Sequence, residues 1–463
     1  MTVDSGFVRH PGSTDAPRGL RTLVRGAAVV TLDNELGDFE QADVLIDGDT
    51  ISMVAPKLEV DDARVVDASG MIAIPGFVDT HRHTWQSAMR HGYAEMNPLQ
   101  YFVDVLQGIG AGYTPEDVHI GTLLGAASEL NAGTTTLVDW SHIQNSSEHS
   151  DAAISALADS WIRAVFAHGW PLTTDDRWTK DSALPHPADI ERLNKQYFAG
   201  DNPLLTLAMA ARGPEMTLPT VWRADLELAR ALGIRTSVHV GAYPHNAAHH
   251  AVAQYGRAGL LGADMTFVHC CGCSDAELAM IADAGASVSL GVHCEMNSQG
   301  IGDIPLDRLL SIGLRPSLSG DTETKCTGDM FTQMRLLYAY YRSWRGGGHS
   351  AMSTPPDLLL RDVLEFATIE GARAAGLDHR VGTLTPGKQA DIVLIRATDV
   401  NLAPVLDPVA AIVLSAHEGN VDSVLVAGDF VKANGHPVRL DHSALIREAK
   451  ISQKRVLGHS VNV

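Results

Sequence analysis

The sequence predicts an α/β protein, a (β/α)8 TIM barrel with a small β-sandwich domain formed from the N- and C-terminal segments. The middle of the chain, about residues 75–380, alternates strand-like apolar runs with segments of helical periodicity. Both ends instead contain short β-type runs separated by turn residues. Eight strand–helix repeats over about 300 residues fit a barrel, for which about 250 residues are typical and insertions are common.

The β-type runs at the two ends predict one composite domain. They occupy residues 22–25, 27–32, 42–49, 51–54, 382–395 and 421–429. Because the same pattern of short β-type runs and turns returns after the barrel segment, we expect both ends of the chain to form a single domain. The expected organisation is an N-terminal arm at 1–20, the β-sandwich at 21–74 and 381–440, the barrel at 75–380 and a C-terminal helical tail at 441–463.

Eight apolar runs in the middle of the chain are the expected barrel strands. The first ends at Asp79, and the others lie at residues 135–139, 163–167, 205–209, 235–239, 265–269, 286–290 and 315–319. A helix is expected between strands at residues 221–232, where Gly233 supplies a C-terminal signal. In such a barrel, polar residues at the C-terminal ends of the strands are the candidates for function.

Composition and charge limit the partners of the protein. Of 463 residues, 45% are hydrophobic and 19% charged, as in a folded protein, and 35 basic against 55 acidic residues give a net charge of −20. That charge argues against nucleic-acid and anionic-membrane partners, which bind basic surfaces. No apolar run approaches the ~18 residues of a membrane span, and residues 1–20 lack the apolar centre of a signal peptide.

All five cysteines lie between Cys270 and Cys326, and they are too few for a disulfide framework. The cluster Cys270-Cys271-Gly272-Cys273 could suggest a zinc thiolate site, but the second cysteine pair of such a site is missing. We interpret these residues as small side chains buried at a strand end. This cysteine usage predicts a cytoplasmic protein.

Two histidines directly follow the first barrel strand, in the segment Pro75-Gly76-Phe77-Val78-Asp79-Thr80-His81-Arg82-His83. On a β-strand, the i, i+2 spacing of His81 and His83 points both imidazoles to the same side. At the C-terminal end of a barrel strand, that side is the mouth of the barrel. Two neutral imidazoles that converge on one point suit a divalent metal such as Zn²⁺ or Fe²⁺.

Four more polar residues follow later barrel strands directly or closely: His239, His269, His293 and Asp321. A single histidine in such a place is more often structural or substrate-contacting than a metal ligand. Their recurrence at successive strand ends, with an aspartate near the last, instead favours a metal-dependent hydrolase. A divalent metal held by imidazole and carboxylate side chains can lower the pKa of a bound water from about 15.7 towards ~7.

Five segments give the chain a resemblance to a known family. It resembles the amidohydrolase superfamily, and within it the branch that contains cytosine, guanine and S-adenosylhomocysteine deaminases and the s-triazine hydrolases. The matching segments span nearly the whole chain, and their order is as specific as each motif. They are residues 75–83, Ala132-Gly133-Thr134-Thr135-Thr136, Val268-His269-Cys270, Leu318-Ser319-Gly320-Asp321 and Gly387-Lys388-Gln389-Ala390-Asp391-Ile392-Val393.

This resemblance implies one divalent metal ion per subunit, bound by His81, His83, His239 and Asp321, with Zn²⁺ preferred and Fe²⁺ left open. It also implies that His269 lies beside the metal and polarises the substrate, and that the protein is a homo-oligomer. Asp321 can both bind the metal and take the proton of the water, and His269 can hydrogen-bond the developing tetrahedral centre. No strand-end lysine is present to be carbamylated and bridge two metals.

At one position the chain departs from this branch. Deaminases of the branch carry a glutamate three residues after the third metal histidine, where it moves a proton from water to the leaving group, whereas this chain has Ala242. Our hypothesis is that Glu295, after the seventh strand, is the relocated general acid/base or an anchor for the substrate amine, with His293 assisting. The alternative is that Glu295 is a solvated loop residue.

Six further residues near strand ends could contact a small-molecule substrate: Trp85, Gln86, Trp140, His142, His168 and Arg212. Each has a structural alternative, since the tryptophans could fill space beneath loops and Arg212 could form a salt bridge in the barrel rim. If Trp85, Trp140 and Trp170 surround the mouth, they would suit a flat heterocycle by stacking.

The sequence therefore predicts a metal-dependent amidohydrolase or aminohydrolase that acts on carbon–nitrogen bonds other than peptide bonds. The expected reaction is attack of a metal-bound hydroxide on an electron-poor ring or amidine-like carbon, with deamination of an aminated nitrogen heterocycle. Because Ala242 offers no proton carrier, hydrolysis of a cyclic amide or displacement of an alkylamine or halide stays open. A non-hydrolytic lyase, decarboxylase or cyclase and a non-catalytic metal-binding scaffold are further alternatives.

Overall fold

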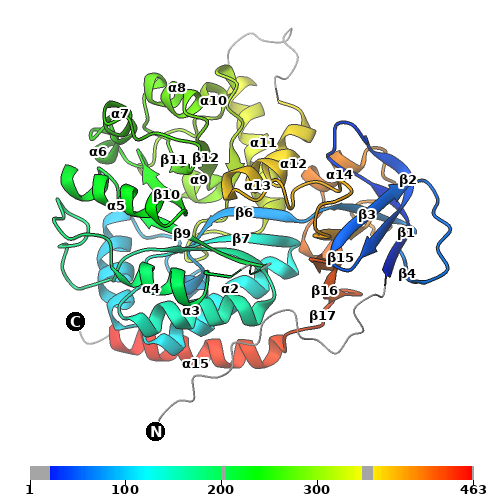
Figure 1. The fold of residues 1–463 in the computed structure, drawn as a ribbon, viewed down its shortest axis with the longest axis horizontal. Helices are drawn as coiled ribbons and strands as arrows, with labels where there is room; N and C mark the ends of the chain where they lie inside the picture. Colours follow the sequence, from blue (N-terminus) through cyan, green and yellow to red (C-terminus); the bar gives the residue numbers. More distant parts are fainter. Residues whose placement is uncertain (1–20, 201, 203, 347–357, 461–463) are drawn as a thin grey trace.

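Eight parallel strands form one of two sheets in the computed structural model, which describes residues 21–200, 202, 204–346 and 358–460 (Figure 1). The predicted arm at 1–20 lies outside the described residues. The strands are bonded to one another in chain order, and all eight lie where barrel strands were predicted. They are β6 (Phe77–Arg82), β7 (Thr134–Ser141), β8 (Arg163–His168), β9 (Leu205–Ala211), β10 (Arg235–Val240), β11 (Met265–His269), β12 (Ser287–Leu290) and β13 (Ser317–Leu318).

The chain after β13 returns to β6 and nearly closes the barrel. Arg82 and Asp321 form a parallel bridge. The Asp321 N–H donates to the His81 carbonyl at 2.9 Å, and the His83 N–H donates to the Asp321 carbonyl at 2.9 Å. The backbone thus joins the two segments that carry three of the predicted metal ligands, and the predicted barrel is confirmed.

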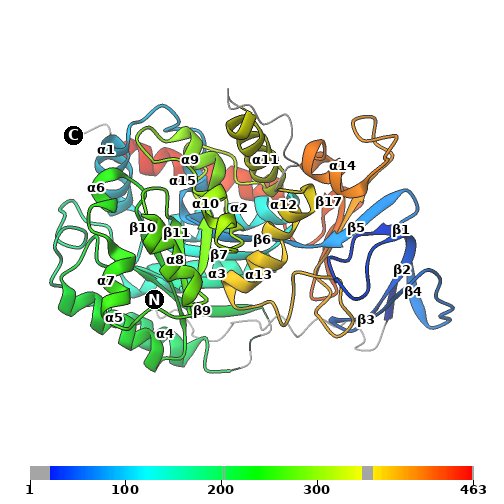
Figure 2. The ribbon, with the colours of Figure 1, turned by 90° about the horizontal axis from the view of Figure 1, so that it is seen from above.

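Helices between the strands cover the outside of the barrel, as Figures 1 and 2 show from two directions. The helix predicted at residues 221–232 is α5, and Gly233 just beyond it has a φ of +69°, the left-handed conformation that ends many helices. The covering helices are α2 (Pro115–Asn131), α3 (Ser147–Ser160), α4 (Asp189–Gln196), α5 (Pro219–Ala231), α7 (Ala251–Arg257), α8 (Asp275–Asp283), α10 (Leu306–Ser311), α11 (Met330–Gly346), α12 (Leu360–Phe366) and α13 (Ile369–Ala375).

Short helical segments follow several barrel strands and contribute to the loops above the barrel. The π-helix η2 carries Tyr101 and Phe102, two residues that return below as part of the cavity wall. The segments are η1 (Thr84–Met89), α1 (Pro98–Gln100), η2 (Tyr101–Ile109), η3 (Gly110–Gly112), α6 (Pro244–Ala247) and α9 (Val292–Asn297).

The two ends of the chain build the second sheet together, as predicted. Antiparallel pairing of Ile74 with Val393 and of Ile72 with Ile395 joins the N-terminal part to the C-terminal part. The strands form one nine-stranded mixed sheet in which β1 pairs with β2 on one side and with β4 and then β5 on the other. They are β1 (Arg21–Val29), β2 (Phe39–Asp47), β3 (Thr50–Ala55), β4 (Ala63–Asp67), β5 (Met71–Pro75), β14 (Ile392–Arg396), β15 (Val421–Val426), β16 (Asp429–Ala433) and β17 (His436–Pro437), with α14 (Pro408–Leu414) and η4 (Glu418–Asn420) in the connections.

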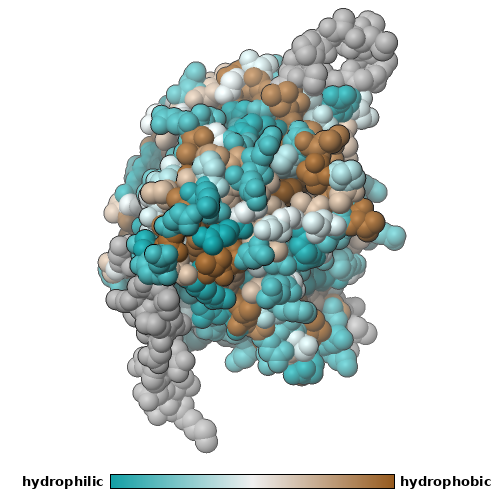
Figure 3. All heavy atoms as spheres, turned by 90° about the vertical axis from the view of Figure 1, so that its right-hand side faces the viewer, coloured by the Kyte–Doolittle hydropathy of each residue, from teal (hydrophilic) through white to brown (hydrophobic). Residues whose placement is uncertain are grey.

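The chain passes from this sheet into the barrel at Gly76. The Gly76 N–H donates to the Asp391 carbonyl at 2.9 Å, and a Cβ at this position would lie 2.0 Å from Oγ1 of Thr135. Only glycine therefore allows β5 and β6 to follow one another directly. Figure 3 views the molecule from the composite-sheet end, where hydrophobic side chains are scattered among hydrophilic ones.

The last described helix, α15 (His442–Ser460), packs on the barrel helix α2 (Figure 1, red). Ser452 Oγ donates to Asp117 Oδ1 at 2.7 Å, and Gln453 Nε2 donates to the Ala88 carbonyl at 2.9 Å. A helical segment was predicted here. Across the described residues, no helix has both the length and the apolar character that a membrane crossing requires.

Candidate metal centre and active site

The end of β6 places two histidines in one site and anchors itself with the residue between them. His81 and His83 are 0% and 5% exposed, and their ring centroids lie 4.7 Å apart. Arg82 is instead ion-paired with Glu129 and with Glu323, which are also buried. The alternation of a strand thus separates the two imidazoles from the guanidinium, as the i, i+2 spacing indicated.

His239 from β10 and Asp321 after β13 meet these two histidines. Nε2 of His239 lies 3.1 Å from Nε2 of His81, and the three imidazoles offer nitrogens within 4.8 Å of one another. Asp321 Oδ1 lies 3.5 Å from His81 Nε2 and 3.4 Å from His83 Nε2. Asp321 also has a φ of +54°, a strained conformation for a non-glycine residue, of the kind that clusters at functional sites.

The protonation states of this cluster suit a divalent metal ion. Burial lowers the pKa of His83 to about 3 and lowers the pKa of His81 and His239 as well, so the imidazoles are neutral. Burial raises the pKa of Asp321, but the contact with His81 and the charge of His269 outweigh it, and this pKa lies well below its usual value. Three neutral imidazole nitrogens and one carboxylate oxygen are a common donor set for Zn²⁺.

One backbone contact orients His83 for such a role. Its Nδ1 lies 2.8 Å from the Trp140 carbonyl and donates a hydrogen bond to it. The proton is therefore on Nδ1, and the lone pair of Nε2 faces His81 and Asp321. A second partner that fixes the tautomer in this way is typical of metal-ligating histidines, so the residues present fit the predicted metal.

His269, at the end of β11, lies beside the cluster and is held by Glu295. Its ring stacks on that of His239 with centroids 5.3 Å apart, and its Nδ1 donates to Glu295 Oε1 at 3.1 Å. Burial lowers the pKa of His269, but the hydrogen bond to Glu295 and the charge of Asp321 outweigh it and raise this pKa above its usual value. A protonated His269 can donate a second hydrogen bond from Nε2.

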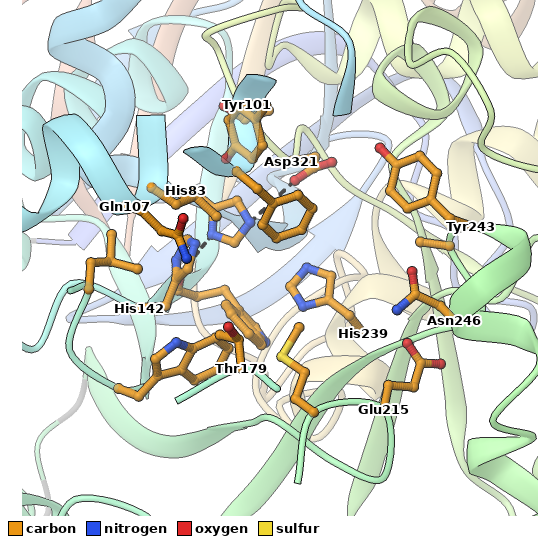
Figure 4. A pocket seen from close by; sticks show the side chains of 18 of the residues that line it. His83, Tyr101, Gln107, His142, Thr179, Glu215, His239, Tyr243, Asn246 and Asp321 are labelled. Carbon is orange, nitrogen blue, oxygen red and sulfur yellow. Dashed lines mark hydrogen bonds and ion pairs between the residues drawn. The ribbon is translucent and has the colours of Figure 1, made fainter. Parts of the chain in front are cut away.

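A pocket lies over this cluster, and its lining includes His83, His239 and Asp321 (Figure 4). In Figure 4, Tyr101, Asp321 and Tyr243 lie on one side of the pocket and Glu215 on the other, with His83 and His239 between them. Pockets of this kind, mostly apolar with a few convergent polar groups, bind small molecules. The aromatic residues in its wall are Tyr101, Phe102, Trp140, Trp170, Trp178 and Tyr243.

The family of the chain follows from its match to a family model. The model of the amidohydrolase family matches residues 72–431, which is well over half of the chain. The chain belongs to the amidohydrolase family. It is therefore a hydrolytic enzyme, and the family and the class of enzyme predicted from the sequence are confirmed.

Curated proteins similar to this amidohydrolase carry deaminase names. It is 25% identical over 460 residues to the 5-methylthioadenosine/S-adenosylhomocysteine deaminase of Caldicellulosiruptor saccharolyticus, which covers 95% of this chain and 99% of that protein. It is 24% identical over 445 residues to the 5′-deoxyadenosine deaminase of Methanosarcina mazei, which covers 94% of this chain and 98% of that protein.

Solved structures share the fold. An adenosine deaminase from Xanthomonas campestris with bound zinc superposes with a TM-score of 0.82 at 22% identity, covering 95% of this chain and 99% of that one. The atrazine chlorohydrolase of Arthrobacter aurescens, complexed with zinc, superposes with a TM-score of 0.81 at 22% identity, covering 93% and 100%. These likenesses agree with the predicted barrel and composite β-domain.

Two of the six predicted substrate contacts, Trp140 and His142, line the cavity. Trp85 and Gln86 lie behind its wall. Trp85 is fully buried and packs edge-on against Tyr113, with ring centroids 5.0 Å apart. Gln86 Nε2 donates to the Tyr101 hydroxyl at 2.7 Å, so it supports a residue of the wall.

The other predicted site residues that lie outside the cavity wall are held in hydrogen-bonded structure. Glu295 is buried against His269 as described, rather than solvated on a loop. His168 contacts His186 Nε2 at 3.0 Å, and Arg212 donates to Asp225 Oδ2 at 3.1 Å. His293 accepts the Thr327 N–H at 3.2 Å. Arg212 therefore forms a salt bridge, with Asp225, which was the expected alternative to a contact with substrate.

Sequence reasoning missed Glu215, a carboxylate in the cavity wall. It lies in the turn after β9, and its Oε1 accepts the Gly241 N–H at 2.7 Å. Its place four residues after the end of a barrel strand was a signal that could have found it. The aromatic residues of η2 were also missed, and no comparable signal marks them, since η2 begins only at Tyr101 whereas β6 ends at Arg82.

Proposed function

We propose that this amidohydrolase removes an amino group, as ammonia, from an aminated nitrogen heterocycle with one divalent metal ion. The observation that carries the proposal is the convergence of His81, His83, His239 and Asp321 beneath an aromatic-lined cavity. The deaminase names of its curated relatives support the same reaction and substrate class.

These four residues would hold the ion, with Zn²⁺ preferred and Fe²⁺ left open because the same donors suit both. A divalent ion bound there lowers the pKa of water from about 15.7 towards ~7 and so makes hydroxide accessible at neutral pH. The ionised Asp321 carboxylate can take the proton that stays on the oxygen after the water has added to the ring carbon. Its low pKa means that it then gives that proton up readily.

His269 would stabilise the transition state. Its Nδ1 is occupied by Glu295, and as a cation it donates from Nε2 to the oxygen that gains charge when the ring carbon becomes tetrahedral. We therefore propose that Glu295 is a positioning residue that acts through His269. His293, hydrogen-bonded outside the cavity wall, has no part in this proposal.

The aromatic wall would bind the ring and exclude water. Trp140 packs edge-on against His239 with ring centroids 4.2 Å apart, and Tyr101 lies across the pocket on η2. A flat heterocycle between such side chains gains stacking contact and loses hydration, which strengthens the polar contacts at the reacting carbon. This arrangement supports a planar substrate class.

A second candidate is the displacement of a halide, which is a better leaving group, from the same kind of ring. The observation that favours it is Ala242, which lines the cavity where the resembling deaminases carry a glutamate. A leaving group that departs without a proton does not need that glutamate. The two candidates differ in the product that is released.

Ammonia release from zinc-loaded protein tests the proposal. The panel comprises adenosine derivatives, aminopurines, aminopyrimidines, aminopterins and amino-triazines, and bound zinc is measured by elemental analysis. We expect ammonia from at least one compound, its loss after chelation and its return with added Zn²⁺. Release of chloride without ammonia would favour the second candidate, and the absence of any product from both kinds of substrate with zinc bound would contradict hydrolytic displacement at this site.

We also propose that the protein is a cytoplasmic homo-oligomer. All five cysteines are buried and free of disulfides, which suits a reducing compartment. Large apolar side chains are exposed on neighbouring segments, Leu99 by 72% and Val103 by 48%, as at many subunit contacts. Light scattering coupled to gel filtration should give a multiple of the 49.5 kDa chain mass, and a monomer at micromolar concentration would contradict this.

A further inference from the structure

Deamination requires a group that carries protons between water and the substrate. An amide ion leaves a carbon poorly, so the departing nitrogen must be protonated as its bond to carbon breaks. Among the described residues that line the cavity, three carry carboxyl groups: Asp175, Glu215 and Asp321. Asp175 is exposed on a loop, and Asp321 belongs to the metal cluster, which leaves Glu215.

The position of Glu215 is fixed from two sides. The turn that carries it is closed by hydrogen bonds from the N–H groups of Met216 and Thr217 to the Gly213 carbonyl. Its carboxylate accepts the Gly241 N–H at 2.7 Å and also interacts with the side chain of Asn246. Figure 4 shows this carboxylate beside Asn246, on the same pocket wall as His239.

Gly241 connects Glu215 with the departure from the family pattern. It lies two residues after the metal-cluster residue His239 and directly before Ala242. The Glu215 carboxylate is therefore bonded to the backbone beside the position that holds the glutamate in the resembling deaminases. It reaches this place from β9, the neighbouring strand of the barrel, rather than from β10.

The surroundings give this carboxyl group a suitable proton affinity. Burial raises the pKa of Glu215 to about 7, and the hydrogen bond from Gly241 only partly opposes that effect. A general acid/base works best when its pKa lies near the working pH, because both protonation states are then accessible. An exposed glutamate, with a pKa of about 4.3, would be a poor proton donor at neutral pH.

We propose that Glu215 is the general acid/base of this amidohydrolase, taking the place of the glutamate that is absent at Ala242. The proposal rests on the proposed deamination. Water forms the new carbon–oxygen bond and gives one proton to Glu215, which passes it to the ring nitrogen next to the reacting carbon. When the carbon–nitrogen bond breaks, Asp321 takes the hydroxyl proton of the tetrahedral carbon and gives it to the amino group. Ammonia leaves and a ring carbonyl remains, so atoms and charge balance.

The first test compares Glu215→Gln with Glu227→Gln, a matched change at an exposed residue of α5. On the best substrate, we expect E215Q to lower kcat by about 10²- to 10⁴-fold with nearly unchanged KM and zinc content, and E227Q to behave as wild type. A kcat within twofold of wild type, or a rise in KM alone, would overturn the proposal while ammonia release by the wild type upholds the proposed function.

The pH profile separates proton transfer from a structural effect. Glu215 must be ionised to accept the proton of water, so the kcat of the wild type should fall as the pH drops below about 7, the pKa to which burial raises this group. In E215Q this acidic limb should be absent, and the remaining kcat should not change with pH over the same range. An unchanged limb in the variant would assign it to another group and overturn the proposal.

A measurement on metal-free protein tests Glu215 without any turnover. The Gly241 amide, labelled by ¹⁵N-glycine, donates to this carboxylate and should shift as it titrates. A midpoint near 7 in wild type and no such shift in E215Q support the proposal, whereas a midpoint near the ordinary ~4.3 overturns it. This readout tests the raised pKa of Glu215 independently of turnover.

A second variant guards against a simple packing defect. Ala242→Glu in the E215Q background places a carboxyl group on the same stretch of cavity wall. We expect its kcat to be at least tenfold higher than that of E215Q. Ala242→Gln in the same background should leave kcat at the value of E215Q. Equal kcat values for these two double variants would show that the activity lost in E215Q does not depend on a carboxyl group in this wall, and would overturn the proposal.

Discussion

Three consecutive residues at the end of β6 have two different structural roles. His81 and His83 face the candidate metal site, while Arg82 is buried among carboxylates that include Glu129 and Glu323. Burial raises the pKa of Glu129, against the attraction of Arg82. Because buried charges are tolerated only when paired, this network fixes the strand end and hence the position of both imidazoles.

At the residue scale, Glu295→Gln should expose the link between Glu295 and His269. Glu295 helps to hold the pKa of His269 above its usual value, so the imidazolium persists to higher pH in the wild type. Glutamine keeps a hydrogen-bond acceptor but removes the charge, and this pKa should fall. We expect the alkaline limb of kcat to move to lower pH and kcat at pH 7.5 to drop about tenfold, with KM and zinc content nearly unchanged.

The control for this change is His293→Gln on the same helix, which should leave the alkaline limb in place because His293 lies outside the cavity wall. An unmoved limb in E295Q, measured on the same substrate and buffer series, would show that Glu295 does not act through His269.

The residues that sequence could predict are those whose direction a strand end fixes. His81, His83, His239 and Asp321 converge because parallel barrel strands bring their C-terminal ends to one mouth. Loop residues follow no such rule. Glu295 was expected at the rim but is buried behind His269, since the short helix α9 turns it inward, and its contact depends on packing that no local pattern encodes.

At the element scale, apolar runs predicted the barrel strands because strands of a parallel sheet are buried on both faces. The expected strand at 315–319 is only Ser317–Leu318, because Pro316 lacks the N–H that a longer ladder would use. The strand β5 and the π-helix η2 were not anticipated. β5 is too short to separate from β6 by pattern alone, and η2 is stabilised by its contacts with α1, η3 and α15.

The contact between β8 and the loop before β14 yields a prediction for stability. Arg163 donates to Asp391 through Nη2 at 2.8 Å and Nε at 3.1 Å, and both side chains are almost fully buried. Asp391→Asn removes the negative charge that faces the buried guanidinium at these two contacts. Removing one partner of such a pair costs about 3–5 kcal/mol of unfolding free energy, and the apparent Tm in calorimetry should fall accordingly.

The exposed pair of Lys57 and Glu59 supplies the control, because both side chains are 79% exposed. Glu59→Ala should leave the Tm unchanged within error, since solvent screens such pairs. The double change Arg163→Met with Asp391→Leu should be less damaging than D391N alone, as apolar replacement removes the buried charge. A Tm for D391N equal to that of wild type would contradict a structural role for this bridge.

At the scale of the whole molecule, the C-terminal segment closes on elements near the start of the barrel. Pairing of β14 with β5 completes the composite sheet, and α15 then packs on α2, η1 and η2. This order means that the last residues support the segment that carries Tyr101 and Phe102, part of the cavity wall. The composite domain was predictable from its turn pattern, whereas this long-range packing was not.

Deleting residues 441–463 should therefore weaken substrate binding more than metal binding. The deletion uncovers apolar surface on α2 and removes the partners of Asp117 and of the Ala88 carbonyl, so the apparent Tm should fall by several degrees. With η2 less supported, KM should rise by roughly tenfold. Zinc content should stay the same, because all four metal-cluster residues lie at barrel strand ends, whereas Lys454→Ala on the exposed face of α15 should change neither quantity. Loss of zinc from the truncated protein, or an unchanged KM despite a lower Tm, would contradict the prediction that the barrel holds the metal while α15 supports the cavity wall.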